Sequence, residues 1–269
     1  PGLALLGRFP ERAPCRQALL DSLAEILAGP VEAGLPQLPQ IRFRKALVAP
    51  FECSGERDVL DASVPEDGDG RTPAGDALTA HPAGGDALDE QPTRGPAPGS
   101  ATATVVAFED PSCPTCARFE REVMPDFLDR YVEPGTVSYV FRGYPVIYDW
   151  GEQGTRALEA VHSRDPDAHW TLAQHFFETQ RRYRAEEAAT VYDRTQDFLA
   201  EATDLDAAAV IDTAREGGAD AAVDTDLEAG EAAGAGRTTP HLFLFRDGEF
   251  RTKSAGYTPL STIEDVLEL

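Results

Sequence analysis

Two of the four cysteines in this 269-residue chain, Cys113 and Cys116, stand two residues apart in the sequence Cys-Pro-Thr-Cys. Thiols at this spacing suit disulfide exchange, because one can form a mixed disulfide with a substrate and the other can resolve it. A β-rich run at residues 102–108 precedes the pair, and a helical pattern follows it. We therefore expect Cys113 at the N-terminus of a helix, where free backbone N–H groups and the helix dipole stabilise a thiolate.

The same placement predicts a division of roles. Cys113 is expected to be the exposed, nucleophilic thiol, and Cys116, one turn further along, the buried resolving thiol. Pro114 suits the first helical turn, where its missing N–H has no partner to lose. Pro114 and Thr115, which lie between the cysteines, are expected to support the pair.

Two other readings of the Cys-x-x-Cys pair are open. The pair is half of a zinc site, but the other half would be Cys15 and Cys53, which are separated by 37 residues. A structural disulfide is the second reading, although a two-residue loop at the start of a helix is an uncommon place for one. Cys15 and Cys53 could also pair with each other. We expect neither a metal nor an organic cofactor.

A second motif lies more than a hundred residues downstream, where Thr239 and Pro240 precede an apolar strand at residues 242–245. Proline is tolerated at the first residue of a strand. Its peptide bond would be cis if it makes a tight turn that faces the sulfur of Cys113. The backbone of Thr239 would then be free to pair with an extended substrate segment.

Composition divides the chain into three zones. Residues 1–60 are neutral and unassigned, and residues 61–100, rich in Asp, Gly, Pro and Ala, read as a linker. Residues 101–269 read as an α/β domain in which a helical block, at about 150–233, separates the second strand from the proline-led strand. The predicted strands span residues 102–108, 137–141, 242–245 and 249–253, with helices from the cysteine pair to about 131 and over 259–269.

Residues 108–116 and 238–248 resemble the active-site segment and the cis-proline hairpin of the DsbA-like branch of the thioredoxin superfamily. The resemblance covers residues 101–269 and implies a thioredoxin-like fold with a helical insertion. It also implies a protein thiol–disulfide oxidoreductase whose partners are protein thiols or disulfides and a further redox protein. The family often has a buried acid six positions before the first cysteine, where this chain has Ala107. Glu109 and Asp110 are the nearest acids, and either could act through water.

Other features leave the direction of exchange open. Strongly oxidising members of the family carry His in the third motif position, which is Thr115 here. His241 follows the proline and could face the sulfur. The alternatives are a reductase, a non-catalytic binding module that keeps the fold, and a glutathione-linked transferase or isomerase; the last commonly lacks the second cysteine. His162, His169 and His175 lack the i, i+4 spacing of a helical metal pair, so we expect them to pack.

The formal net charge of −23 argues against binding to nucleic acid or to an anionic membrane surface, because both would repel the chain. Lysine occurs only at Lys45 and Lys253, and the negative charge lies in residues 61–269. Acidic, lysine-poor surfaces are typical of proteins adapted to high salt; an ordinary acidic protein is the alternative. Residues 2–7 are too short for a signal-peptide core, yet we expect the cell envelope or the extracellular space rather than the cytoplasm.

The charge predicts that salt stabilises the protein. The screening length falls from about 30 Å at about 0.01 M salt to about 3 Å at about 1 M, which weakens repulsion within the acidic domain. Thermal denaturation followed by circular dichroism should therefore show a melting temperature that rises between these salt concentrations. A melting temperature that is unchanged or lower in high salt would contradict adaptation to salt.

Overall fold

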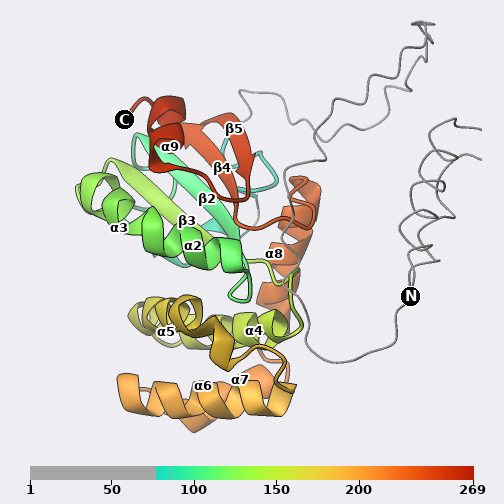
Figure 1. Ribbon diagram of the computed structural model, residues 1–269. Coiled ribbons are helices and arrows are strands. Elements are labelled where there is room, and N and C mark those ends of the chain that lie inside the picture. The colour runs from blue at the N-terminus through green and yellow to red at the C-terminus, as the bar shows by residue number, and fades with distance from the viewer. Residues whose placement is uncertain (1–76, 86) are drawn as a thin grey trace, which may run out of the picture. The chain divides into compact units, whose positions relative to one another are not determined.

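The computed structural model describes residues 77–85 and 87–269. Their core is a five-stranded sheet with the strand order β1-β3-β2-β4-β5 (Figure 1). The strands are β1 (Thr93–Arg94), β2 (Ala103–Glu109), β3 (Val137–Gly143), β4 (His241–Arg246) and β5 (Glu249–Ala255). The four strands predicted from the sequence correspond to β2 to β5, and only the short β1 is additional.

The central strand β2 runs parallel to β3 and antiparallel to β4. Val105 is opposite Tyr139 on one side and Leu244 on the other. β5 returns beside β4 through a turn at Asp247 and Gly248, both with positive φ, as the hairpin signal predicts.

The helices of the domain occupy the predicted parts of the chain. The α-helices are α2 (Pro114–Glu122), α3 (Met124–Phe127), α4 (Trp150–His162), α5 (Pro166–Thr179), α6 (Ala188–Ala202), α7 (Ala207–Arg215), α8 (Asp220–Ala232) and α9 (Leu260–Leu267). Short turns of other helix types are η2 (Leu88–Glu90), η3 (Leu128–Val132) and η4 (Gln180–Arg182).

One predicted helix is divided. A single helix from the cysteine pair to about residue 131 was expected, but α2 ends at Glu122 and α3 begins at Met124. Pro125 explains the division, because proline lacks the N–H for the helical hydrogen bond and crowds the preceding turn. The four-residue spacing of Phe119, Val123, Phe127 and Tyr131 also predicts a buried stripe; the first three are buried, and Tyr131 is partly buried.

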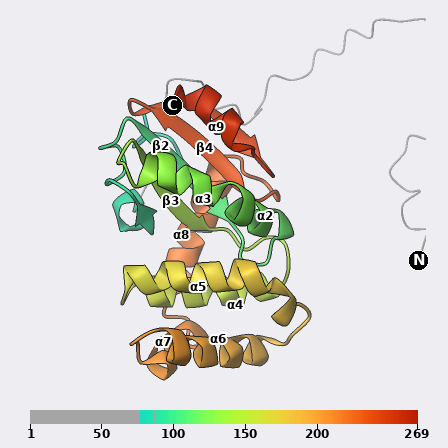
Figure 2. The same cartoon turned by 60° about the vertical axis from the view of Figure 1, so that its left-hand side comes forward.

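Helices α4 to α8 form the predicted helical insertion between β3 and β4. Figures 1 and 2 show α4 to α7 stacked on one another beyond the end of the sheet at which β2 leads into α2, and α8 running back toward the sheet. The architecture is therefore the expected α/β fold with a helical insertion. Within the described part of the chain, no helix is both long enough and apolar enough to cross a membrane.

Both faces of the sheet are apolar, because consecutive residues of β2 are apolar and their side chains point alternately to the two faces. On β2, Val105 and Ala107 join the cluster formed with α2 to α7 and α9, whereas Val106 and Phe108 join a second cluster on the opposite face, against which α8 also packs. A sheet with two apolar faces needs a cover on each.

The cover of the second face corrects the predicted linker. Residues 77–85 and 87–100 pack on the sheet rather than forming a tether: Leu78 and Leu88 lie in the second cluster, and the ring of His81 stacks on Phe250 at 4.5 Å. The segment has few large apolar side chains, but these few are enough to hold it on the sheet, because the strands supply the rest of the apolar surface. Residues 61–76 and the N-terminal zone 1–60 lie outside the described residues.

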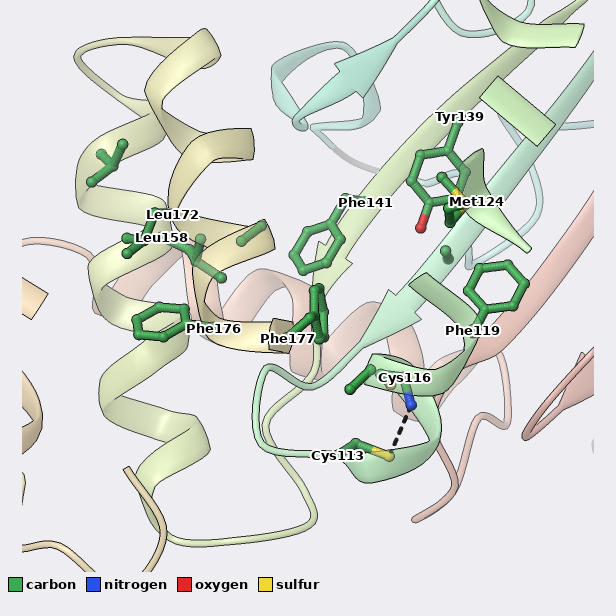
Figure 3. Close-up of a cluster of buried hydrophobic side chains, with 14 of the residues drawn as sticks. Cys113, Cys116, Phe119, Met124, Tyr139, Phe141, Leu158, Leu172, Phe176 and Phe177 are labelled. Atoms are coloured by element: carbon green, nitrogen blue, oxygen red, sulfur yellow. Dashed lines mark hydrogen bonds between the residues drawn. The ribbon is translucent and has the colours of Figure 1, made fainter. Parts of the chain in front are cut away.

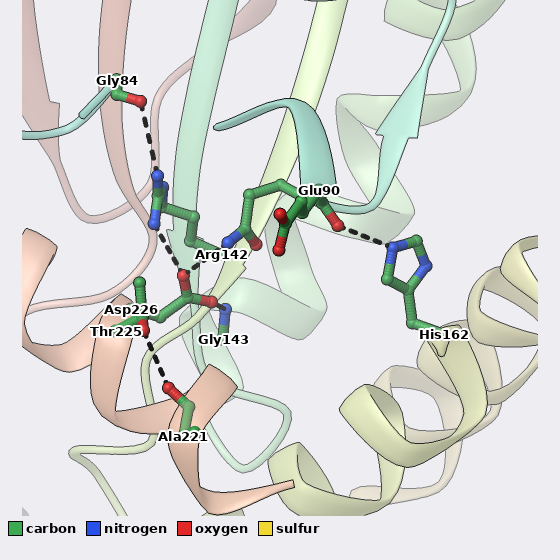
Figure 4. A network of polar contacts seen from close by, with 9 residues as sticks. Gly84, Glu90, Arg142, Gly143, His162, Ala221, Thr225 and Asp226 are labelled. Atoms are coloured by element: carbon green, nitrogen blue, oxygen red, sulfur yellow. Dashed lines mark hydrogen bonds and ion pairs between the residues drawn. The ribbon is translucent and has the colours of Figure 1, made fainter. Parts of the chain in front are cut away.

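A buried ion pair joins this segment to the sheet and to α8 (Figure 4). Arg142 of β3 lies 2.7 Å from a carboxylate oxygen of Asp226. The other oxygen of Asp226 accepts the backbone N–H of Gly143 at 2.8 Å, and Gln91 donates to the first at 3.0 Å. Burial raises the pKa of Asp226 to about 6, although Arg142 opposes the rise. The hydrogen bonds compensate part of the cost of burying both charges.

Truncation of the leucines tests whether the segment is a cover or a tether. Leu78→Ala and Leu88→Ala should each lower the free energy of unfolding by about 2 kcal/mol, because each would leave a cavity against the sheet. The exposed neighbour Thr79 provides the control, since Thr79→Ala removes no buried contact. Urea denaturation measures all three. Leucine variants as stable as the control would mean that the segment contributes nothing to the fold.

Candidate active site

Strand β2 delivers the cysteine pair to the start of α2. The chain turns through residues 110–112 after β2, and Cys113 then takes an extended conformation as the N-cap of α2. Pro114 occupies the first helical position, as expected. The sulfur of Cys113 accepts the backbone N–H of Cys116 at 3.5 Å (Figure 3), so it replaces one of the hydrogen bonds that the first turn lacks.

The segment before β4 lies against the same sulfur. The Thr239–Pro240 peptide bond is cis, which confirms the prediction for Pro240. The Cys113 thiol donates to the carbonyl oxygen of Thr239 at 3.3 Å. Two segments that are more than a hundred residues apart in the sequence therefore meet at one sulfur atom.

The neighbouring Cys116 thiol and the start of α2 make Cys113 acidic for a thiol. Its pKa is lowered to about 5, chiefly by the hydrogen bond from the Cys116 thiol. A hydrogen bond with Thr239 and the backbone N–H groups of Cys116 and Thr115 lower it further, while burial opposes them. Thr115 thus contributes through its backbone. Cys113 is predominantly a thiolate at neutral pH.

Cys116 has the opposite environment. Its pKa is raised well above the usual value by burial, by its hydrogen bond to Cys113 and by the negative charge of Glu109. The order of burial is as expected, but the exposed thiol predicted for Cys113 is wrong: only 3% of Cys113 is accessible, against 0% of Cys116. The Thr239 segment lies across the Cys113 sulfur, which a reading of the active-site segment alone does not reveal.

A buried carboxyl group lies next to Cys116. Glu109, the last residue of β2, is fully buried, and the hydroxyl group of Tyr139 donates a hydrogen bond to it. The same hydroxyl lies 3.4 Å from a carboxylate oxygen of Glu120 on α2. Burial and the charge of Glu120 raise the pKa of Glu109, against hydrogen bonds with Tyr139 and Cys116 that lower it. Glu109 is therefore a proton-holding group within reach of the buried thiol.

Glu109 lies two residues after Ala107, the position at which the resembling family often has its acid. Because side chains alternate along a strand, Ala107 and Glu109 point to the same face of β2. The acid is thus displaced by one step of the alternation and remains on the side of the sheet that carries α2. The two-residue period of a strand was enough to place Glu109 on this face. The contacts that Tyr139 and Glu120 make around Glu109 did not follow from the sequence.

Asp110, the other candidate acid, is fully engaged in shaping the loop. One of its oxygens accepts the N–H and the hydroxyl of Ser112 at 2.7 and 2.6 Å, and the other accepts the N–H groups of Val146 and Ile147 at 2.9 and 2.8 Å. Burial raises its pKa to about 6, and these hydrogen bonds oppose the rise. Gly151 lies so close that a Cβ there would meet Asp110 at 2.5 Å. Asp110 therefore holds the active-site loop against the start of the helical block.

Gln180 of η4 is a contact that the sequence did not predict. Its side-chain amide donates to the carbonyl oxygens of Pro111 and Cys113 at 2.9 and 2.8 Å. The helical insertion is thereby tied to the active-site loop at the nucleophilic residue itself.

His241 and His169 are not part of this cluster. His241 hydrogen-bonds through Nδ1 to the carbonyl oxygen of Ala235 at 2.9 Å, and its ring stacks on Phe243, on the second face of the sheet. His169 is fully buried and packs against Phe141, as expected of a core residue, and burial lowers its pKa to about 3. Cys15 and Cys53 lie outside the described residues.

Several solved structures have the same fold. BdbD from Bacillus subtilis aligns with 68% of this chain and 95% of its own, with a TM-score of 0.55 and 21% identity. The alpha-DsbA1 protein of Wolbachia pipientis aligns with 66% of this chain and 89% of its own, with a TM-score of 0.55 and 16% identity. At these identities the similarity establishes the fold.

Sequence comparison adds a relative and a family. A probable disulfide bond formation protein D of Bacillus anthracis is 30% identical over 78 residues, which are 29% of this chain and 36% of the relative, so the match spans little more than a third of that protein. The thioredoxin family model matches residues 94–263, which include Cys113, Cys116, Pro240 and the whole helical insertion. The chain belongs to the thioredoxin family.

Proposed function

We propose that the chain is a protein thiol–disulfide oxidoreductase that donates disulfides to protein thiols through Cys113 and Cys116. The observation that carries the proposal is the position of the Cys113 sulfur at the N-terminus of α2, where it accepts the backbone N–H of Cys116 and has Thr239 beside it. A thiol with a pKa of about 5 is a good leaving group, which favours release of an oxidised substrate. The names of the relatives, which refer to disulfide bond formation, support the same direction.

The proposed reaction has two exchange steps. In the first, a substrate thiolate attacks the Cys113 sulfur of the Cys113–Cys116 disulfide; that bond breaks, and its electron pair goes to the Cys116 sulfur. In the second, another substrate thiolate attacks the substrate sulfur of the mixed disulfide, and Cys113 leaves as a thiolate. The substrate is oxidised by two electrons and the pair is reduced. A disulfide of a separate redox protein then reoxidises the pair, so neither metal nor organic cofactor is needed.

Glu109 is proposed to supply the proton that the Cys116 sulfur takes up in the first step. The raised pKa of Glu109 keeps its carboxyl group protonated nearer to neutral pH than an exposed glutamate, and Cys116 is a much weaker acid. Thr239 presents its backbone beside the sulfur, where an extended substrate segment can pair with it. The catalytic unit is proposed to span residues 101–269, with the second face of its sheet covered by the segment before it. Its proposed place is the cell envelope or the extracellular space, where disulfides persist.

Trapping of a mixed disulfide tests the proposed function. Reduced Cys116→Ser protein incubated with a disulfide-bonded peptide should accumulate a covalent adduct at Cys113, because the resolving thiol is absent. Cys113→Ser should form no adduct and should lose exchange activity. Intact-protein mass spectrometry identifies both outcomes. Exchange that survives in Cys113→Ser would refute the assignment, and a wild-type protein without exchange would favour a binding module.

Alkylation measures the acidity of the two thiols. The rate of modification of Cys113 by iodoacetamide should rise as the pH passes through about 5 and then level off, because the thiolate is the reactive form. Cys116 should remain unmodified through neutral pH, and Cys113→Ser provides that control. A rate that rises only near pH 8 to 9, roughly the range of a free thiol, would contradict the stabilised thiolate.

Glu109→Gln tests the proton donor. The oxidised variant should oxidise a dithiol peptide at least roughly tenfold more slowly than the wild type, because Gln cannot protonate the leaving Cys116 sulfur. The ratio of wild-type to variant rates should shrink as the pH rises, since Glu109 then loses the proton that it donates. Glu228→Gln, at an exposed position of α8, is the matched control. A ratio that stays constant with pH would indicate a structural role only.

A further inference from the structure

A groove of about 670 Å³ opens beside the active-site cysteines. Ser112, Pro114 and Ala117 line it from the active-site segment, and the buried rings of Trp150 and Phe177 line it from the helical insertion. Pro114 directly follows the nucleophilic Cys113, so a polypeptide joined to that sulfur has this groove next to it.

Four arginines, Arg121, Arg181, Arg182 and Arg184, surround the groove, together with the single acid Glu178. They come from α2, from η4 and from the turn that follows η4, and all four are exposed. This concentration of positive charge is unexpected in a chain with 47 acidic and 24 basic residues.

Most other arginines of the described residues have acidic partners, whereas Arg94, Arg164 and Arg237 contact a tryptophan ring, carbonyl oxygens or a hydroxyl group. Eight other arginines of the described residues form ion pairs with Asp or Glu: Arg118, Arg130, Arg142, Arg156, Arg194, Arg215, Arg246 and Arg251. Among residues 77–85 and 87–269, none of the four at the groove has an acidic group within ion-pair distance. Their guanidinium groups are therefore available to an external carboxylate.

Contacts within the protein hold this charge near the nucleophile. Gln180, directly before Arg181, donates hydrogen bonds to the carbonyl oxygens of Pro111 and Cys113. The guanidinium group of Arg184 lies 5.2 Å from the centre of the Tyr148 ring, which orients it at the wall of the groove. The arginine-bearing turn is thus attached to the active-site loop rather than to a remote part of the insertion.

We infer that this groove binds an acidic segment of the substrate polypeptide, adjacent to the cysteine that reacts with Cys113. The inference rests on the proposed function for the identity of the substrate, and on the arginine groove for its charge. Arginine binds carboxylates through two parallel hydrogen bonds, and the apolar rings of the floor can hold the aliphatic part of the segment. Because the arginines come from three parts of the chain around one groove, several successive carboxylates match it better than a single small anion.

Equilibrium binding separates this inference from the redox chemistry. Short fluorescent peptides in which serine replaces the reactive cysteine, with acidic, neutral or basic flanks, are titrated with the full-length protein, and fluorescence anisotropy gives the dissociation constants. At about 0.15 M salt the acidic peptide should bind most tightly, and its advantage should shrink at about 1 M salt, where screening is stronger.

A charge-matched pair of variants locates the site. Arg181→Gln/Arg184→Gln should weaken binding of the acidic peptide about threefold to tenfold and leave the neutral peptide unchanged. Arg215→Gln/Arg251→Gln removes the same charge at exposed positions away from the groove and should have little effect. Equal losses in both double variants, or no preference for the acidic peptide, would overturn the inference. Competition by glutathione disulfide as effective as that by the acidic peptide would also overturn it, because a small anion would then suffice.

Exchange with a small neutral disulfide provides the independent readout for the proposed function. The wild-type protein and the Arg215→Gln/Arg251→Gln control should react with it at the same rate, since the control changes neither the groove nor the cysteine pair. If the protein prefers the acidic peptide but shows no exchange, the proposed oxidoreductase function is refuted and the binding site for an acidic segment is supported. If the protein shows exchange but no preference for the acidic peptide, the binding site for an acidic segment is refuted and the proposed oxidoreductase function is supported.

Discussion

The register between β2 and β4 brings the reactive sulfur and the cis-proline segment together. Phe108 is paired with His241, so the chain leaving β2 and the chain entering β4 lie at the same end of the sheet. The loop that leads to Cys113 and the Thr239–Pro240 segment therefore meet there. A shift of that register by one residue would turn the alternating side chains to the wrong faces and move Thr239 away from the sulfur. The low pKa of Cys113 depends on this pairing as well as on the start of α2.

The site is built from polar groups that burial disfavours, and the structure compensates each in a different way. Asp110 receives four hydrogen bonds, two from Ser112 in the active-site loop and two from Val146 and Ile147, which precede the helical block. Glu109 instead shares the hydroxyl group of Tyr139 with Glu120, which leaves its own proton tightly held. A carboxylate surrounded by donors shapes a loop, whereas a poorly compensated one stores a proton. This difference in surroundings assigns the two neighbouring acids to different roles.

The helical insertion contributes to the site as well as to the core. Its first helix approaches Asp110 so closely that only glycine fits at position 151. Its η4 turn reaches the carbonyl oxygen of Cys113 through Gln180 and carries the arginines that surround the groove. The insertion thereby supplies the wall of the substrate groove, while the sheet and α2 supply the reacting sulfur atoms. Chemistry and substrate preference are thus carried by different parts of the fold.

The sequence by itself determined the elements and the reactive pair. A β-rich run marked β2, the helical pattern and Pro114 placed Cys113 at a helix start, and Pro240 ahead of an apolar strand indicated the cis bond. These signals are local, because periodicity and capping act over a few residues. Tertiary structure decided the burial of Cys113 beneath Thr239, the choice of Glu109 over Asp110 as the acid beside Cys116, and the contact of Gln180 with the active-site loop. It also turned residues 77–85 and 87–100 from an expected tether into the cover of the sheet, since Leu78 and Leu88 become core residues only when the opposing strands provide an apolar surface. Such contacts depend on which distant residues meet, and composition and spacing do not contain that information.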